Sequence, residues 1–407
     1  MRPERTLRHP YAGANSRCAG IVLQPVFAPT YRGVLTGSRT EGSIVERHAQ
    51  GPLRRGWTTG ACATAATRAA YTALLTGRFP DPVQITLPRG QQPSFLLAHR
   101  KLLADRACAG VIKDAGDDPD VTHGALVMST VSHARAGEGV LFAAGPGVGT
   151  VTLPGLPVPV GEPAINPAPR RMMRAVIEEV SAQHGATGDV MIEVAIRNGA
   201  KLAERTWNPR LGIMGGLSVL GTSGIVVPYS CSAWIHSIRR GIDVARATGT
   251  RHIGAATGSA SEAATRLHHG LDETAMIDMG DFAGGMLRYL KSHPVPRLTI
   301  GGGFAKLTKL AQGALDLHSS RSQVDFSRLA ALARECGAGP ATADDIRCAS
   351  SASRVLELAR SAGVPLADAV AAAARTTALD ALGQSPVAVE VLVFDRDGTL
   401  TGEAHGW

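Results

Sequence analysis

The sequence predicts an α/β protein with two structured parts. Over residues 51–205, strand patterns are followed by isolated helical patterns, which is typical of an α+β domain. Over residues 206–340, short apolar strands alternate with amphipathic helical segments, and this alternation predicts a mostly parallel, doubly wound sheet. Residues 341–407 are expected to add Ala-rich helices and a final strand.

The first part is expected to begin near Leu53. An Ala-rich helix should run from 61 to 75 and stop at Gly77, because glycine commonly ends a helix. In the other segments, the spacing of apolar residues predicts strands, except for one later segment where it predicts a helix. We expect strands over 83–87, 125–131, 149–153 and 189–197, a strand ending at Lys113, and a helix over 170–182.

The second part is expected to repeat strand and helix. Its strands are predicted over 251–256, 275–278 and 297–300, and the helices that follow them over 260–269, 282–292 and 304–316. Residues 341–383 have a helical, Ala-rich composition, and residues 387–394 form a last apolar strand.

Residues 1–50 show no sustained periodicity and are expected to form a disordered arm. Residues 1–55 hold nine Arg, three Glu and no Lys or Asp, so they carry +6 of the net charge of +8. A basic face on a folded domain would indicate nucleic acid, and this distribution argues against that partner. An Arg-rich start could also be an organellar transit peptide, a bacterial extension or a start codon placed too early.

The composition is that of a soluble globular protein, with 44% hydrophobic and 19% charged residues. The six cysteines are scattered without a CxxC pair, so we expect reduced thiols, a cytoplasmic location and no zinc site. No apolar run approaches the ~18 residues that a membrane span needs, so no membrane partner is expected.

Five glycines interrupt the apolar segment 212–228. Such density indicates that the backbone passes close to another backbone or to a ligand, and we interpret the segment as the mouth of a ligand site. The glycines do not spell GxGxxG, so the segment is no dinucleotide fingerprint.

Thr58, Thr59 and Gly60 precede the first helix. Hydroxyl groups here can cap the helix, and its free amides can bind a carboxylate. Simple capping is the alternative.

Asp114, Asp117, Asp118 and Asp120 crowd one loop, with His123 beyond it. Carboxylates this close raise one another's pKa if water is excluded, which is one way to obtain an acid or base near neutrality. The spacing does not fit a calcium loop, and the alternative is a surface turn.

The segment Asp395–Thr399 follows an apolar strand and matches the nucleophile motif of haloacid-dehalogenase-type phosphatases. That fold needs further acid and base residues downstream, and the chain ends soon after the motif. We therefore expect a terminal hairpin with a glycine turn.

Several long motifs occur in order along the chain. They are residues 55–66, 113–124, 161–167, 208–226 and 306–313, with His318-Ser319 after them. Together they resemble the cobalt-precorrin-5B C-1 methyltransferase family, CbiD. The resemblance implies an α+β part and a Rossmann-like part. It also implies methyl transfer from S-adenosylmethionine to C-1 of a cobalt-containing corrinoid, giving cobalt-precorrin-6A, in the oxygen-independent route to cobalamin.

The sequence departs from the family pattern in two places. Gly302–Lys306 lacks a histidine that the family usually has there, and Leu317 replaces a Thr before the His-Ser pair. Both changes concern one wall of the site, and they put the substrate detail in more doubt than the reaction class.

The resemblance and the predicted strand ends together indicate which residues bind the cofactor and which bind the substrate. Ligands of open parallel sheets bind beyond the carboxyl ends of the strands, where Asp278 and Asp281 could bond the cofactor's ribose or amino group. For Asp281, capping of a helix is the alternative. The expected cofactor residues are Gly215, Gly216, Gly221, Thr222, Thr257, Gly258, Asp278 and Asp281. The expected substrate residues are Arg55, Thr58, Thr59, Asn166, Arg170, Lys306 and His318.

Asp114, Asp117 and His123 are the expected catalytic residues, and no metal bound by the protein itself is expected. The rival functions are a non-catalytic corrinoid or tetrapyrrole carrier and a phosphatase built on the terminal Asp motif. A homo-oligomer is left open.

Overall fold

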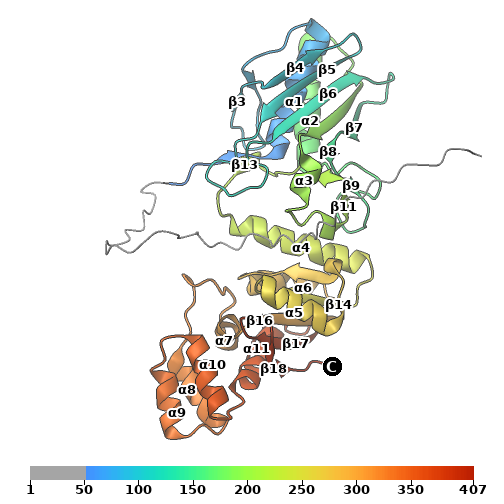
Figure 1. The fold of residues 1–407 in the computed structure, drawn as a ribbon. Coiled ribbons are helices and arrows are strands. Elements are labelled where there is room, and N and C mark those ends of the chain that lie inside the picture. The colour runs from blue at the N-terminus through green and yellow to red at the C-terminus, as the bar shows by residue number, and fades with distance from the viewer. Residues whose placement is uncertain (1–51) are drawn as a thin grey trace, which may run out of the picture. The chain divides into compact units, whose positions relative to one another are not determined.

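The computed structural model describes residues 52–407, so the arm expected over 1–50 lies outside the described residues. The first sheet has the strand order β4-β5-β6-β10-β7 (Figure 1). In this sheet β10 is parallel to β7, and the other neighbours are antiparallel. Its strands are β4 (His99–Leu102), β5 (Arg106–Ile112), β6 (Leu126–His133), β7 (Val140–Ala144) and β10 (Val190–Ile196).

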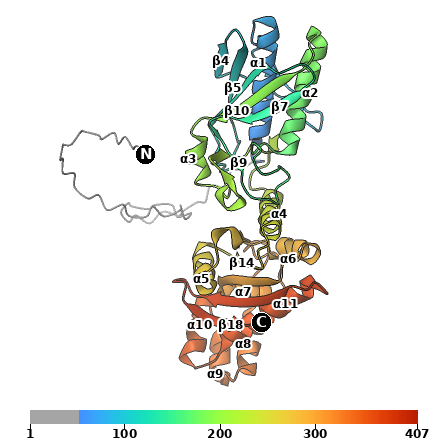
Figure 2. The same ribbon diagram turned by 90° about the vertical axis from the view of Figure 1, so that its right-hand side faces the viewer.

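Two long helices, α1 (Thr59–Thr76) and α2 (Pro167–His184), pack side by side on this sheet (Figures 1 and 2). Ala63, Ala66 and Ala70 of α1 are fully buried, since their small side chains let the helix approach the strands closely. The helix ends at Gly77 in the left-handed region (φ 76°), as the sequence predicts.

Short strand pairs attach the glycine-rich segment to the first part of the chain. Within that segment, β11 (Ile213–Met214), β12 (Gly216–Leu217) and β13 (Ile225–Val226) pair with earlier strands. Their partners are β9 (Thr150–Val151), β8 (Gly147–Val148) and β1 (Gly56–Trp57), respectively. Residues 213–226 thus continue the first part, and we propose a boundary near Pro228 in place of the one expected at 205.

Smaller elements connect these pairs. They are β2 (Val83–Gln84) with its antiparallel partner β3 (Ser94–Phe95), α3 (Gly199–Ala203) and the 3-10 helix η1 (Pro209–Leu211).

The second sheet has the order β15-β14-β16-β17-β18. Its first four strands are parallel and the last is antiparallel, so the sheet is mostly parallel, as expected. The strands are β14 (His252–Ala256), β15 (Met276–Asp278), β16 (Arg297–Gly303), β17 (Ala388–Phe394) and β18 (Leu400–Ala404). Together the two sheets and their helices confirm the mixed α/β class.

Helices cover both faces of the second sheet. Ile253, Ala255 and Ile300 point into an apolar core that also contains residues of α4, α6, α7 and α11. Strand side chains alternate between faces, and α5 contacts the opposite face. The bounds are α4 (Cys231–Ala247), α5 (Ser259–His269), η2 (Glu273–Ala275), α6 (Ala283–Ser292), α7 (Phe304–Ala311) and α11 (Leu366–Leu382).

The C-terminal region is helical, as expected. Residues 340–382 form three helices, α9 (Pro340–Arg347), α10 (Ala352–Ser361) and α11, and α8 (Phe326–Glu335) packs on α9 (Figure 1). β17 and β18 form the predicted terminal hairpin. In its turn, Gly398 has φ 82° and the Asp395 carboxylate accepts the N–H groups of Asp397 and Thr399.

In residues 52–407 no helix is long and apolar enough to cross a membrane.

Candidate functional site

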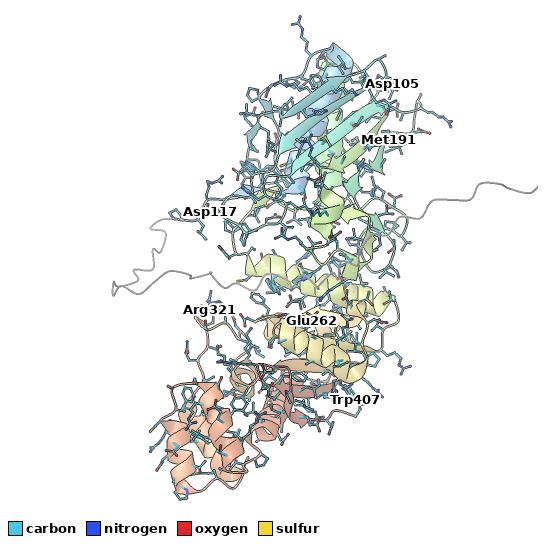
Figure 3. All side chains as sticks on the ribbon, viewed as in Figure 1. Asp105, Asp117, Met191, Glu262, Arg321 and Trp407 are labelled. Carbon is cyan, nitrogen blue, oxygen red and sulfur yellow. The ribbon has the colours of Figure 1, made fainter. Side chains whose placement is uncertain are left out.

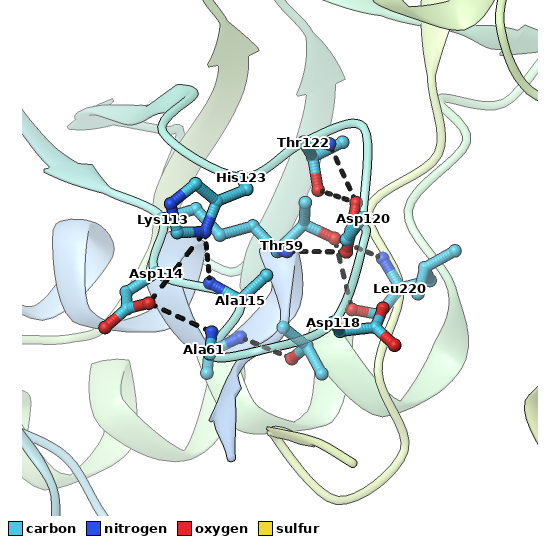
Figure 4. A network of polar contacts seen from close by, with 12 residues as sticks. Thr59, Ala61, Lys113, Asp114, Ala115, Asp118, Asp120, Thr122, His123 and Leu220 are labelled. Carbon is cyan, nitrogen blue, oxygen red and sulfur yellow. Dashed lines mark hydrogen bonds and ion pairs between the residues drawn. The ribbon is translucent and has the colours of Figure 1, made fainter. Parts of the chain in front are cut away.

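The loop of residues 113–124, here called the Asp loop, connects β5 to β6 (Figure 4). The Arg54 guanidinium bonds both oxygens of Asp114, with Nη2 to Oδ1 at 2.9 Å. These bonds and a backbone bond from Gly116 lower the pKa of Asp114 to about 2. The expected rise in pKa required that water be excluded, and Asp114 does not meet this condition, because its side chain is 44% exposed and its pKa is lowered. The group is ionised near neutrality and cannot act there as an acid.

Each of the other carboxylates of the loop accepts a hydrogen bond from a different donor. Asp117 lies on the surface (Figure 3), where its Oδ2 accepts the Arg54 N–H at 2.6 Å. Asp118 accepts the N–H of Tyr229 at 2.9 Å. Asp120 accepts the ammonium of Lys113 at 2.6 Å (Figure 4).

Asp120 and Lys113 form an ion pair that is largely shielded from water. The Lys113 side chain is 1% exposed. Burial raises the pKa of Asp120, but the charge of Lys113 and the bonds from Thr122 outweigh burial and hold this pKa below its usual value. The Asp loop is thus fastened by charge pairs and hydrogen bonds.

His123 lies near the end of the Asp loop, with its ring partly exposed. Its Nδ1 accepts the Ala115 N–H at 3.1 Å, so the neutral ring carries its proton on Nε2. The side chain is 54% exposed and borders a cavity of about 370 Å³. The cavity is lined by Ala98, Ile112, His123, Gly124, Ala125, Leu126, Arg197, Asn198 and Leu202.

The start of α1 is largely occupied by the chain itself. The Thr58 hydroxyl caps the helix by accepting the Ala61 N–H, and Thr59 Oγ1 accepts the Leu220 N–H. The Gly60 N–H donates to the Leu220 carbonyl at 2.9 Å. These bonds favour the capping alternative for Thr58 and Thr59 and leave little free donor capacity for a carboxylate.

At two of the expected cofactor glycines, the protein's own packing leaves no space for a side chain. A Cβ on Gly216 would lie 2.4 Å from the Gly147 backbone, and one on Gly221 would lie 2.2 Å from Thr58 Oγ1. Gly215 has open space around its Cβ position within residues 52–407, and Thr222 is exposed. The glycine density therefore reflects close approach to the protein's own backbone and side chains.

The expected substrate residues of the first part differ in how many hydrogen bonds their side chains already make within the protein. Arg170 is held by the Ile165 and Pro163 carbonyls and by Glu162, so it already has a structural role. Arg55 is exposed, and its side chain makes no hydrogen bond with any described residue. Asn166 precedes α2 without capping it through its side chain.

The second sheet gathers several predicted residues at its carboxyl edge, between β14 and β16. After β14 the chain turns to β15 on one side, and after β16 it continues to β17 on the other, so this is a topological switch point. Lys306 Nζ donates to the Thr257 carbonyl at 2.8 Å and lies 3.0 Å from Asp281 Oδ1. We call Thr257, Gly258, Asp278, Asp281, Gly301–Gly303 and Lys306 the strand-end site.

Two glycines of the strand-end site have open space at the Cβ position. A Cβ on Gly258 or on Gly303 would meet no atom within 4 Å in the described part of the chain. Gly258 precedes α5, whose first turn has no side-chain cap. The strand-end site therefore combines open backbone with charged groups.

Asp278 ends β15 in a partly dry environment. Burial raises its pKa to about 6, Glu262 adds to this rise, and Arg210 and Lys306 oppose it. Arg210 and Glu262 pair with each other at 2.6 Å, and the Glu262 position on α5 is labelled in Figure 3.

His318 belongs to a local turn. Its Nδ1 lies 2.7 Å from Ser320 Oγ, and the Leu317 N–H donates to the Asp281 carbonyl. The turn thus lies beside the strand-end site through Asp281.

Residues 46–228 match the model of the CbiD family, and residues 316–405 match the model of the CbiD C-terminal domain. The chain belongs to the CbiD family. The first match ends where the pairing of the glycine-rich segment ends, which agrees with a boundary near Pro228.

Curated relatives share most of the chain. The cobalt-precorrin-5B C(1)-methyltransferase of Brucella anthropi is 60% identical over 348 residues, which cover 86% of this chain and 95% of the relative. The protein of the same name from Rhodospirillum rubrum is 60% identical over 351 residues, covering 86% and 97%. A solved structure titled cobalamin biosynthesis protein (cbiD), from Archaeoglobus fulgidus, has 23% identity and a TM-score of 0.35, covering 77% of this chain and 85% of that one.

Sequence reasoning on this CbiD family member missed two residues of interest. Arg54 rather than Arg55 holds the Asp loop, and the sequence has no signal that separates these neighbours. Trp234 lies in α4, a helix that is absent from the sequence prediction. The spacing of Ile235, Ile238 and Ile242 could have indicated that helix.

Proposed function

We propose that this chain methylates C-1 of cobalt-precorrin-5B to give cobalt-precorrin-6A in anaerobic cobalamin biosynthesis, with S-adenosylmethionine as methyl donor. The observation that carries the proposal is the 60% identity to a cobalt-precorrin-5B C(1)-methyltransferase over 95% of that relative's length. The corrinoid is the substrate partner and brings its own cobalt. In the described residues no group of three or more His, Cys, Asp or Glu could hold a metal ion.

The strand-end site fits the methyl donor. Asp281 Oδ1 is buried and accepts no hydrogen bond from the described residues, although Lys306 Nζ is near it. An acceptor with spare capacity suits a hydroxyl or ammonium donor, such as the ribose or the amino group of S-adenosylmethionine. The open Cβ positions of Gly258 and Gly303 leave space beside it.

The roles at the strand-end site follow from these groups. Asp278 and Asp281 accept hydrogen bonds from the donor, and the uncapped amides of α5 after Gly258 receive its carboxylate. Thr257 supports Lys306, which keeps the Asp281 carboxylate in place. When bound, S-adenosylmethionine supplies an electrophilic methyl group, whose bond to sulfur breaks as a bond to carbon C-1 forms.

We propose that the first part of the chain contacts the corrinoid's carboxylate arms. Within residues 52–407 neither the exposed Arg55 guanidinium nor the Asn166 side-chain amide makes a hydrogen bond, so Arg55 could bind a carboxylate and Asn166 could add a further contact. His123 lines a cavity and is the group we favour for any proton transfer, and Asp117 of the same loop stays a second candidate. His318 remains a proposed substrate contact at the strand-end site.

Catalysis would then rest chiefly on alignment. The macrocycle provides an electron-rich carbon, and the protein brings it to ~3–3.5 Å from the reacting methyl group. The four parallel strands with helices on both faces support a Rossmann-like classification for the second part. A cytoplasmic location and self-association stay predictions.

A reaction assay tests the proposed function. The purified full chain is incubated with S-adenosylmethionine and cobalt-precorrin-5B, and the corrinoid is analysed by mass spectrometry. We expect the corrinoid to gain one methyl group and S-adenosylhomocysteine to form in equal amount. Corrinoid binding without consumption of S-adenosylmethionine would instead identify a carrier.

A further inference from the structure

Aromatic side chains gather at the carboxyl edge of the second sheet, and the roles above do not use them. The chain has four tryptophans. Two of them, Trp207 and Trp234, contact each other edge to face with ring centroids 5.3 Å apart. Phe282 lies 6.2 Å from Trp234, and Trp234 remains 40% exposed. An aromatic surface fixed by two neighbours and still open to solvent can receive a ligand.

Trp234 is tied directly to the strand-end site. Its Nε1 donates to the Asp278 carbonyl at 3.1 Å. A Cβ on Gly280 would lie 3.3 Å from the indole, and the Gly280 N–H donates to the Ala256 carbonyl at the end of β14. The indole thus lies against the loop that carries Asp278 and Asp281.

The charges around Asp278, whose backbone carbonyl accepts the indole N–H, favour a cation. Asp278, Asp281 and Glu262 contribute three carboxylates at the strand-end site, and Lys306 and Arg210 contribute two positive groups. An excess of carboxylate beside an exposed indole is the chemistry that binds organic cations, because the ring face attracts positive charge. The sulfonium of S-adenosylmethionine is such a cation, and the thioether left after methyl transfer is neutral.

We propose that Trp234 is a positioning residue that borders the methyl-donor site and favours the charged sulfonium over the neutral thioether product. The proposal rests on the proposed function, since it takes S-adenosylmethionine as the donor. Once the methyl group has left, the attraction to the indole is lost. Trp234 therefore both orients the donor and promotes release of the product.

The test compares two affinities. Calorimetry gives the Kd of S-adenosylmethionine and of S-adenosylhomocysteine for the full chain and for Trp234→Leu and Trp234→Phe. We expect Trp234→Leu to weaken S-adenosylmethionine about 2- to 30-fold. The loss for S-adenosylhomocysteine should be smaller, so the preference for the donor falls. Trp234→Phe should give an intermediate preference, because a phenyl ring binds cations less strongly than indole.

Trp407→Leu is a matched control. Trp407, which is labelled in Figure 3, is 45% exposed, and its ring contacts His252 at the opposite end of β14. We expect this variant to keep both affinities and the wild-type preference.

Two outcomes would overturn the proposal while the proposed function stands. One is equal weakening of both ligands in Trp234→Leu, which indicates a structural role. The other is an unchanged preference in Trp234→Phe, which remains informative if Trp234→Leu does not fold. Wild-type protein that binds neither ligand and transfers no methyl group would contradict both the proposed function and this inference.

Discussion

At the scale of single residues, Lys113, the first residue of the Asp loop, places a charge in the protein interior. Its ammonium has Asp120 as its carboxylate partner at 2.6 Å, and its side chain is 1% exposed. We expect Lys113→Met to lower the free energy of unfolding by about 3–5 kcal/mol, because it leaves a largely buried carboxylate without its counter-charge. Urea denaturation measures the change.

The control for this substitution is an exposed pair. Arg347 and Asp344 lie 3.0 Å apart on α9 with both side chains more than half exposed. Arg347→Met should change stability by no more than about 1 kcal/mol, since water screens such pairs. A Lys113→Met variant as stable as this control would show that the loop does not depend on the buried pair.

The sequence indicated that the Asp loop is a polar, charged segment, but it did not indicate which residues its carboxylates contact. The crowding of Asp114 with its neighbours suggested raised pKa values, yet Arg54 approaches from 60 positions earlier and lowers the pKa of Asp114. Local spacing has no information about such a distant partner. His123 was chosen from the same pattern, and the structure places it in the lining of a cavity, with its Nδ1 accepting the Ala115 N–H.

At the scale of secondary-structure elements, Gly216 allows β12 to approach β8. A Cβ at this position would lie 2.4 Å from the carbonyl carbon and oxygen of Gly147. We expect Gly216→Ala to destabilise the protein by about 1–3 kcal/mol or more, because backbone must move to make room. The melting temperature should fall even when no ligand is added.

Gly339→Ala provides the comparison. Gly339 has an ordinary φ of −65°, and a Cβ there would meet no atom within 4 Å in residues 52–407. This variant should melt within a degree or two of the wild type, as expected for a surface change. If Gly216→Ala also melts normally but loses ligand affinity, the glycine serves a ligand after all.

Elements with a strong local pattern were predictable. The alanine run before Gly77 predicted α1, and the order of strands and helices after residue 250 predicted a mostly parallel sheet. Because carboxyl ends of parallel strands meet at one edge, Thr257 and Asp281 could be assigned to one site. The glycine-rich segment was ambiguous, since glycine indicates close approach but does not identify what approaches.

At the scale of the whole molecule, a polar cluster on the α5 face of the second sheet makes stability depend on pH. His252 Nε2 lies 2.8 Å from Thr299 Oγ1, which donates to Glu390. Burial, and then the charge of His269, lower the pKa of His252 to about 4. Arg297 opposes its protonation, and Glu390 favours it.

The sign follows from proton binding. Between the unfolded value of 6.5 and about 4, the unfolded chain binds more protons at His252 than the folded chain does. The folded state is therefore weakened as pH falls through this window. Asp278 has the opposite effect, because its folded pKa of about 6 exceeds the unfolded value of 3.8.

Variants separate the two contributions. We expect His252→Asn to gain stability relative to the wild type as pH falls from 6.5 toward 4, and Asp278→Asn to change in the opposite direction. Urea denaturation across that pH range measures both differences. Differences that stay constant with pH would contradict the expectation.

The pairing of β1 with β13 joins Gly56 to Val226, and the Leu220 carbonyl accepts the Gly60 N–H in the first turn of α1. These contacts close a loop that spans most of the first part of the chain. Closing a long loop costs conformational entropy, and this cost comes before the contacts can stabilise the fold. During synthesis the ribosome must therefore release residues up to about 226 before the start of α1 finds its partners. Until then β1, β8 and β9 lack their strand partners, and a fragment ending at residue 205 would remain in that state, although it contains all five strands of the first sheet.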